Sequence, residues 1–108
     1  MLTDKKCVPC EKGSSPLLPL DVEKYRKELK EGWEVFENTK IKKEFKFKDF
    51  KQAICFVNEV ANVAEFEGHH PDISIHWNKV LIELWTHAIG GLSENDFIVA
   101  AKIDTIEV

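Results

Sequence analysis

Three histidines are the side chains of this sequence best suited to chemistry near neutral pH. His69 and His70 are adjacent, with Gly68 before them and Pro71 after them, and His87 lies further along the chain. An unperturbed histidine has a pKa of about 6.5, so its ring gives or takes a proton near neutrality, and it also binds metal ions. If the fold brings these rings together, the sequence predicts either acid–base catalysis or a metal site.

A β-hairpin is predicted to bring two of the histidines together. Hydrophobic residues alternate on both sides of Asn78-Lys79, which indicates strands over residues 73–77 and 80–87 joined by a two-residue turn. This register pairs Trp77 with Val80, Ile75 with Ile82, Ile73 with Leu84, Pro71 with Thr86 and His70 with His87. Opposed Cβ atoms lie about 4.5–5.5 Å apart, so His70 and His87 are expected to be neighbours at the open end of the hairpin.

His69 is expected to reach the same pocket because of the glycine that precedes it. Gly68 follows a long amphipathic helix at the position where a left-handed residue ends a helix, so the backbone there need not alternate as in a regular strand. Pro71 favours an extended conformation for His70. Glu65 lies four residues before His69 and is predicted to orient its imidazole, as a carboxylate orients a catalytic histidine.

Periodicity and capping residues predict the other elements. Helical spacing predicts one helix after Asp21 that ends at Gly32, and a second over residues 50–67 with Asp49 as its N-cap. A third helix is predicted after Ser93, with Asp96 three residues on as a variant of the capping box. Alternation predicts two more strands, over residues 33–36 and 41–47.

The resulting order is helix, strand, strand, helix, strand, strand, helix. It follows an irregular arm over residues 1–19, which carries three prolines, and it occupies a single domain over residues 20–108. Hairpins require antiparallel pairing. The predicted fold class is therefore α+β, with a four-stranded antiparallel sheet and three helices packed on one face.

Composition and charge narrow the function classes. The 108 residues include 44% hydrophobic residues and carry a net charge of −4, so a core is expected and a nucleic-acid footprint is not. No apolar run approaches the roughly 20 residues of a membrane span, and the first six residues lack a secretory signal. We expect a soluble cytoplasmic protein that binds neither nucleic acid nor membrane.

Metal binding is the main alternative to acid–base catalysis. Three histidines can hold zinc, but adjacent side chains enter one coordination sphere poorly, and no His-x-x-x-His spacing accompanies them. Cys7 and Cys10 form a Cys-x-x-Cys pair in the arm. The pair is compatible with an ordinary tail, with metal or redox capture, and with a disulfide. We expect no metal site at the histidines.

These motifs together resemble a known enzyme family. The segments that carry the resemblance are Glu65-Phe66-Glu67-Gly68-His69-His70-Pro71, Trp77-Asn78-Lys79-Val80, Thr86-His87, Gly91-Leu92-Ser93 with Asp96, Gly32-Trp33 and Phe47-Lys48-Asp49-Phe50. They are similar to those of the pterin-4a-carbinolamine dehydratases over about residues 20–106, and their combination is specific. Two departures stand out. Gly68 replaces an aspartate found in many relatives, and Ile73 replaces an aromatic residue.

The resemblance implies an activity and roles for the site residues. The family dehydrates a tetrahydropterin with a hydroxyl at C4a, formed by aromatic amino acid hydroxylases, to a quinonoid dihydropterin, without a redox cofactor or metal. It suggests that His69 and His87 handle the protons and that His70 binds or assists. Glu65 would orient His69. The resemblance also implies lesser roles, in orienting groups or binding the pterin, for Trp33, Asp96, Pro71 and Thr86.

Two other functions remain open at the sequence level. Animal members of this family also act as dimerisation partners of a transcription factor, so a protein-binding role is an alternative function. A homodimer or homotetramer is expected in either case. Leu81 and Trp85, on the hairpin face away from the core pairs, fit a covered surface. A metal-binding protein is the second alternative, and a role in molybdopterin metabolism, suggested for some bacterial relatives, is a further one.

Overall fold

The computed structural model describes residues 1–8 and 15–108 of the chain. Its elements are η1 (Leu2–Asp4), α1 (Pro19–Arg26), β1 (Glu34–Phe36), β2 (Lys40–Lys46), α2 (Phe50–Glu67), β3 (Asp72–His76), β4 (Lys79–Leu84), η2 (His87–Ile89) and α3 (Glu94–Ile103). The α+β fold class and the predicted order are confirmed. The first helix begins earlier than expected, since Pro19 occupies its first turn.

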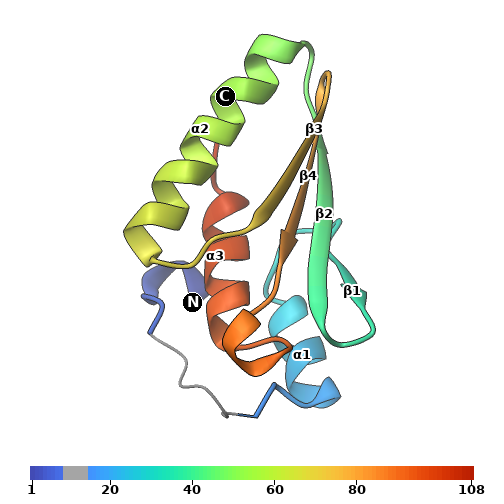
Figure 1. The fold of residues 1–108 in the computed structure, drawn as a ribbon, viewed down its shortest axis with the longest axis vertical. Helices are drawn as coiled ribbons and strands as arrows, with labels where there is room; N and C mark the ends of the chain where they lie inside the picture. Colours follow the sequence, from blue (N-terminus) through green and yellow to red (C-terminus); the bar gives the residue numbers. More distant parts are fainter. Residues whose placement is uncertain (9–14) are drawn as a thin grey trace.

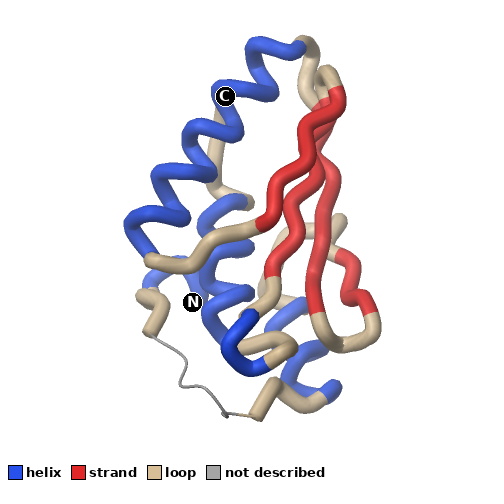
Figure 2. The backbone as a smooth tube through the Cα atoms, viewed as in Figure 1, coloured by secondary structure: helices blue, strands red, loops and turns tan. Residues whose placement is uncertain are grey.

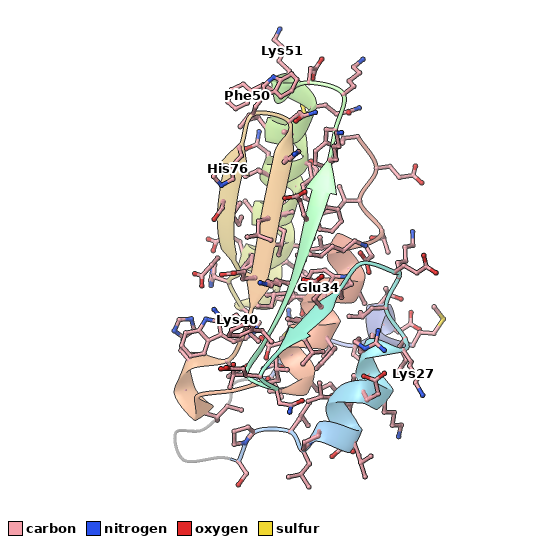
Figure 3. All side chains as sticks on the ribbon, turned by 90° about the vertical axis from the view of Figure 1, so that its right-hand side faces the viewer. Lys27, Glu34, Lys40, Phe50, Lys51 and His76 are labelled. Atoms are coloured by element: carbon pink, nitrogen blue, oxygen red, sulfur yellow. The ribbon has the colours of Figure 1, made fainter. Side chains whose placement is uncertain are left out.

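The four strands form one antiparallel sheet in the order β1-β2-β4-β3. Figure 1 shows α2 and α3 along one side of this sheet, with α1 near the end of β1, and Figure 2 shows the same separation of helices from strands. In Figure 3 the sheet faces the viewer and the helices lie behind it. None of the helices that the structure describes is long and apolar enough to cross a membrane.

Helix α2 is capped at both ends by the residues predicted from the sequence. Asp49 accepts a hydrogen bond from the backbone N–H of Gln52 at 2.8 Å, which satisfies a donor that the first turn leaves free. Gly68 ends the helix with φ +66°, a left-handed conformation that glycine adopts without steric cost. The buried stripe between them includes Phe56 and Val60, which face the sheet side of the core.

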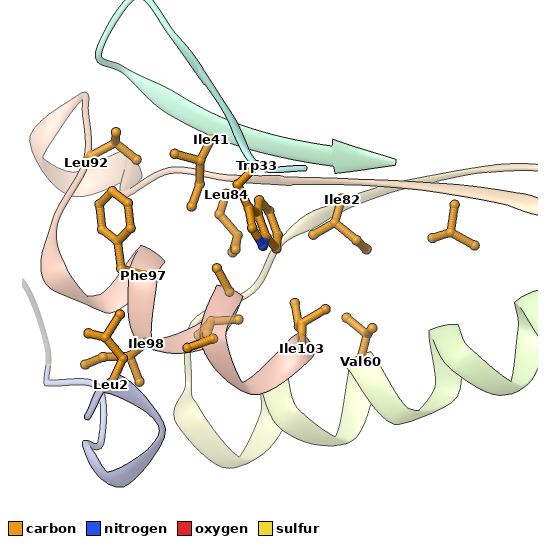
Figure 4. Packing of buried hydrophobic residues seen from close by; sticks show 14 of the residues in the cluster. Leu2, Trp33, Ile41, Val60, Ile82, Leu84, Leu92, Phe97, Ile98 and Ile103 are labelled. Carbon is orange, nitrogen blue, oxygen red and sulfur yellow. The ribbon is translucent and has the colours of Figure 1, made fainter. Parts of the chain in front are cut away.

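The core lies between the sheet and the two long helices. Figure 4 shows Trp33, Ile82 and Leu84 facing Val60 and Ile103 across it. All five are almost or completely buried. The N-terminal residues also contribute, because Leu2 is only 3% exposed and packs in the same cluster. The start of the arm, which the sequence suggested would be irregular, is thus attached to the core.

The hairpin register differs from the prediction by two residues. Trp77 and Asn78, rather than Asn78 and Lys79, form the loop, so Ile73 pairs with Ile82 instead of Leu84. A hydrogen-bond pair explains the shift. The Asn78 amide donates to the Phe47 carbonyl at 2.8 Å, and the Phe47 N–H donates to the Asn78 carbonyl at 2.8 Å. Trp77 accordingly adopts φ +53° in the loop.

The shift preserves the faces of the strands but removes the predicted pairing of histidines. Because side chains alternate with a period of two, a two-residue slip keeps Val80, Ile82 and Leu84 on the buried face. Trp77, predicted to pair with Val80 on that face, instead lies in the loop and is 69% exposed. The ladder, however, runs only from Asp72 to His76 on β3. His70 and His87 are therefore not cross-strand partners.

Trp33 belongs to a polar cluster at the end of α3. Its indole N–H donates to Asp104 at 2.9 Å, and the Lys43 ammonium contacts the same carboxylate at 2.8 Å. Trp33 is 4% exposed, and the side chain of Asp104 is 3% exposed. These contacts hold Trp33 in the core, and its lesser role in orienting groups or binding substrate stays a prediction.

We expect Asp104→Ala to lower the free energy of unfolding by about 2–4 kcal/mol, because it leaves a buried indole N–H and a largely buried ammonium without their acceptor. Urea denaturation followed by tryptophan fluorescence measures this change. Glu31→Ala, at an exposed position, is the matched control and should stay within about 0.5 kcal/mol of the parent protein. Equal effects of the two substitutions would contradict this account of Trp33.

Candidate active site

One cleft collects the three histidines. It has a volume of about 760 Å³ and is lined by His69, His70 and His87, together with residues that flank them in sequence. One side comes from the end of α2 and the loop after it, and the other from the segment that follows β4. The shared pocket predicted from the sequence is therefore present, although the hairpin ladder does not create it.

His69 is held by a buried carboxylate. Its Nε2 atom lies 2.6 Å from Oδ1 of Asp96, whose side chain is fully buried, while the His69 side chain is 14% exposed. The other oxygen of Asp96 accepts the Thr86 hydroxyl at 2.8 Å and the backbone N–H of Ser93 at 2.9 Å. Asp96 is thus saturated with donors, and it fixes which nitrogen of His69 is engaged.

The position of Asp96 in α3 explains how a buried carboxylate is tolerated. It is the N3 residue of the predicted capping box with Ser93, which the structure confirms. Negative charge is favourable in the first turn of a helix, where backbone N–H groups and the helix dipole converge. The same carboxylate therefore caps α3 and orients His69.

The two adjacent histidines point to different carboxylates. The N–H of His69 bonds back to the Ala64 carbonyl at 3.2 Å, which continues the turn made by Gly68. His70 instead contacts Glu65 through Nε2 on the exposed side of the helix end. The predicted contact of Glu65 with His69 is wrong. Glu65 engages His70, and Asp96, expected to have a lesser role, engages His69.

His87 stacks on a tryptophan at the rim of the cleft. Strand β4 ends at Leu84 instead of continuing to residue 87, and the rings of Trp85 and His87 are 3.8 Å apart with 29° between their planes. The loop that carries His87 is closed by the Thr86 N–H, which donates to the Gly91 carbonyl at 2.8 Å. His87 is exposed, and both aromatic rings line the cleft.

The other nominated residues divide between the cleft and the core. Pro71 and Thr86 line the cleft. Ile73, the second departure from the family pattern, packs partly buried against the core instead. At Gly68 a Cβ atom would have no neighbour within 4 Å, so the space beside it is open, but its φ of +66° is unfavourable for most side chains.

Sequence reasoning missed one wall of the cleft, which comes from the N-terminal arm. Lys6, Cys7 and Val8 line it beside the histidines, and so does Asn95 of α3. The position of this wall depends on tertiary packing of the arm against the helices, which local sequence patterns do not reveal. Nothing in the composition of the arm shows where it packs, although its apolar Leu2 could have indicated attachment to the core.

Cys7 is placed in this wall as a protonated thiol. Burial and the neighbouring Glu67 carboxylate raise its pKa to about 12. Its Sγ donates to the Asn95 carbonyl at 3.5 Å. Cys10 lies outside the described residues, so the predicted Cys-x-x-Cys chemistry stays a prediction. Across residues 1–8 and 15–108, no three His, Cys, Asp or Glu side chains are grouped to hold a metal ion.

Comparison with known proteins identifies the family. The family model described as pterin 4 alpha carbinolamine dehydratase matches residues 16–106. The chain belongs to this family of hydro-lyases. It is 49% identical over 106 residues to a Rickettsia bellii protein, provisionally named a pterin-4-alpha-carbinolamine dehydratase, with 98% of this chain and 94% of that protein covered. A Nitrosomonas europaea protein with the same provisional name is 50% identical over 97% of this chain and 92% of its own.

Solved structures carry the same fold. A Brucella melitensis protein described as a transcriptional coactivator/pterin dehydratase superposes with a TM-score of 0.77 and 32% identity, over 82% of this chain and 95% of that one. A pterin dehydratase-like protein described as a RuBisCO assembly factor in the alpha-carboxysome gives a TM-score of 0.58 and 27% identity, over 68% and 86%. Proteins with this fold are thus described as a transcriptional coactivator and as an assembly factor, as well as dehydratases.

The buried position of Asp96 leads to a test by substitution. We expect Asp96→Asn to lower the free energy of unfolding by about 2–4 kcal/mol, because an amide replaces one acceptor oxygen with a donor that faces existing donors. Glu65→Gln, at the exposed carboxylate of the other histidine, should change it by less than about 0.5 kcal/mol. Chemical denaturation of both variants at one pH measures the difference. Similar losses in the two would disprove the distinction.

Glu67 adds a pH-dependent contribution beneath the same cleft. Burial opposes its ionisation, but the Lys102 ammonium and the Cys7 N–H outweigh burial and hold its pKa below the ordinary 4.5. Its stabilisation is therefore present above pH 4.5 and is lost as the pH falls through the lower folded-state value.

In Glu67→Gln we expect a lower stability at pH 7 and a shallower decline of stability below pH 4.5. Urea denaturation over a pH series measures both. Lys102→Met removes the partner of Glu67 and should weaken the same decline. If Glu67→Gln kept the full acid dependence of the parent protein, another carboxylate would be responsible.

Proposed function

We propose that this protein dehydrates 4a-hydroxytetrahydropterin to quinonoid dihydropterin by histidine acid–base catalysis, as a step of tetrahydrobiopterin recycling. The observation that carries the proposal is the pair of His69 and buried Asp96 in a cleft shared with His70 and His87. Family membership supplies the reaction class. The pathway would place the protein in the cytoplasm, next to an aromatic amino acid hydroxylase.

The reaction requires two proton transfers and involves no change of oxidation state. The C4a–O bond breaks as a proton reaches the departing oxygen, and a proton leaves N5, so that its electron pair forms the N5–C4a double bond. The products are water and the quinonoid dihydropterin. Groups that exchange protons near neutral pH suit both transfers, and imidazole is the natural choice.

His69 is suited to one of these transfers. Because Asp96 engages Nε2, the nitrogen left for a substrate is Nδ1. A carboxylate on the far nitrogen fixes the ring and stabilises the imidazolium that forms when Nδ1 takes a proton. The fully buried position of Asp96 keeps this arrangement rigid, which limits the motion needed to reach the productive geometry.

His87 and His70 supply the rest of the acid–base chemistry. His87 is exposed at the rim and stacks on Trp85, so it can meet a substrate from the side opposite the α2 end. A flat pterin ring fits a cleft that already displays aromatic faces. His70, held by Glu65 on the exposed side, is assigned to binding or to assistance in proton transfer.

A second function, protein binding, has a specific observation in its favour. Phe50, the first residue of α2, and Trp77, at the hairpin tip, are large apolar side chains that are 50% and 69% exposed. Where exposed aromatic groups adjoin one another in a patch, they can form a surface at which a protein associates with itself or another protein. The description of the Brucella melitensis relative as a coactivator and dehydratase is consistent with both functions in one fold. Light scattering would detect a homodimer or homotetramer.

Substitution of the histidines tests the catalytic proposal. We expect His69→Ala and His87→Ala to lower kcat for synthetic 4a-hydroxytetrahydropterin by roughly 10²–10⁴-fold, since each removes a positioned proton donor or acceptor. Stopped-flow absorbance, corrected for the uncatalysed dehydration, measures the rate. His76→Ala is the matched control, because His76 is exposed on β3 and lies outside the cleft.

The proposal is wrong if both cleft variants fold and turn over like the parent protein. Circular dichroism and urea denaturation establish whether they fold. If His76→Ala alone were slow, the catalytic group would lie elsewhere on the sheet.

A further inference from the structure

The N-terminal arm packs against the two elements that position His69. Lys5 forms an ion pair with Glu94 at 2.6 Å, and the Lys6 ammonium donates to the Phe66 carbonyl at 3.0 Å. The Cys7 N–H donates to Glu67 at 2.8 Å. The arm is thus tied to the last turn of α2 and to the first turn of α3 where it lines the cleft. In Figure 1 its first residues lie beside α3, below the end of α2.

The side-chain amide of Asn95 forms two hydrogen bonds with the backbone of Val8, the next residue of the arm. The Val8 N–H donates to Oδ1 of Asn95 at 3.1 Å, and Nδ2 of Asn95 donates to the Val8 carbonyl at 2.5 Å. Asn95 is 5% exposed, so its end of these bonds is shielded from water, although Val8 is largely exposed. It also directly precedes Asp96. One turn of α3 therefore fixes both His69 and the backbone of Val8.

The Val8 side chain remains uncovered although its backbone is fixed. Val8 is 66% exposed and lines the cleft with the three histidines. Covering an apolar group at the wall of a cleft stabilises the complex with the ligand, by about 25 cal/mol per Å² of apolar surface removed from water. Because the arm is already ordered, a ligand would not have to order it on binding.

We propose that residues 6–8 form a substrate-contacting wall of the active site, in which Val8 meets the non-reacting surface of the pterin and Asn95 positions Val8. This inference rests on the proposed dehydratase function, because it assigns the wall to that substrate. The histidines carry the proton transfers, whereas the wall offers an apolar contact. The arm therefore contributes to affinity and substrate choice rather than to the chemical step.

Uniform binding predicts a specific kinetic signature. An interaction made equally in the ground state and the transition state changes KM and leaves kcat nearly constant. We expect Val8→Ala to raise KM and the Kd for 7,8-dihydrobiopterin roughly three- to tenfold, as two methyl groups are lost from the contact. Because Val8 is exposed, this substitution should leave the stability of the fold close to that of the parent protein.

Asn95→Ala tests the positioning role by a different readout. We expect KM to rise at least as much as in Val8→Ala, and trypsin to cut faster after Lys5 and Lys6, since the arm loses its double hydrogen bond. Asp4→Ala, in the arm but outside the cleft lining, is the matched control for both measurements. A merely structural role for Asn95 would lower stability and leave the KM of the folded enzyme unchanged.

Stopped-flow kinetics and calorimetric titration with 7,8-dihydrobiopterin separate the possible failures. Turnover with unchanged KM and Kd in both variants would overturn the inference and leave the dehydratase function standing. Dihydropterin binding that weakens in the variants, in a protein without turnover, would support the wall and disprove the catalytic proposal. If the parent protein neither bound the dihydropterin nor turned over, both proposals would be wrong.

Discussion

The fully buried carboxylate of Asp96 is the constraint on which the site depends. An ionised group inside a protein is tolerated only when donors surround it, and Asp96 has donors from three different segments: the Ser93 N–H, the Thr86 hydroxyl and the His69 ring. These segments are the start of α3, the exit of β4 and the loop after α2. Satisfying one carboxylate therefore brings together the parts of the chain that form the cleft.

This arrangement also explains why two adjacent histidines need not share a function. Gly68 turns the chain at the end of α2, so that His69 points inward to Asp96 and His70 points to Glu65 on the exposed side. One imidazole is thereby held in a rigid, mostly buried setting, and its neighbour in a solvated one. The divergence fits acid–base roles better than a single coordination sphere, in which both rings would have to face the same ion.

The elements of the fold were predictable because each depends on local signals. Asp49 and Gly68 bound α2 as their side chain and backbone preferences require, and the capping box of Ser93 and Asp96 begins α3. The hairpin register was not predictable. Its two candidate loops differ only in whether Trp77 or Lys79 lies in the turn, and the choice depends on Asn78 bonding to Phe47 in another part of the chain.

The sequence predicted which residues gather at the site better than it predicted which of them contact one another. The three histidines, Thr86 and Asp96 were nominated from sequence and do meet around one cleft, directly or through His69. Helical spacing suggested that Glu65 reaches His69, but that spacing fails once the chain passes a left-handed residue. Trp33 matched the family pattern, and the structure shows its indole N–H bonded to Asp104 in the core rather than a place in the cleft lining. A family pattern records retained residues without distinguishing catalytic from structural reasons.

Gly68 illustrates how a departure from the family pattern acts through both backbone and charge. Its left-handed φ is easily adopted by glycine, and aspartate adopts this conformation more readily than most other side chains. The space beside it is open, so packing does not require a glycine there. A glycine at this position adds no charge beside the histidines. The carboxylates around the histidines are Asp96 and Glu65, which contact the imidazole rings, and Glu67 and Asp72, which also line the cleft.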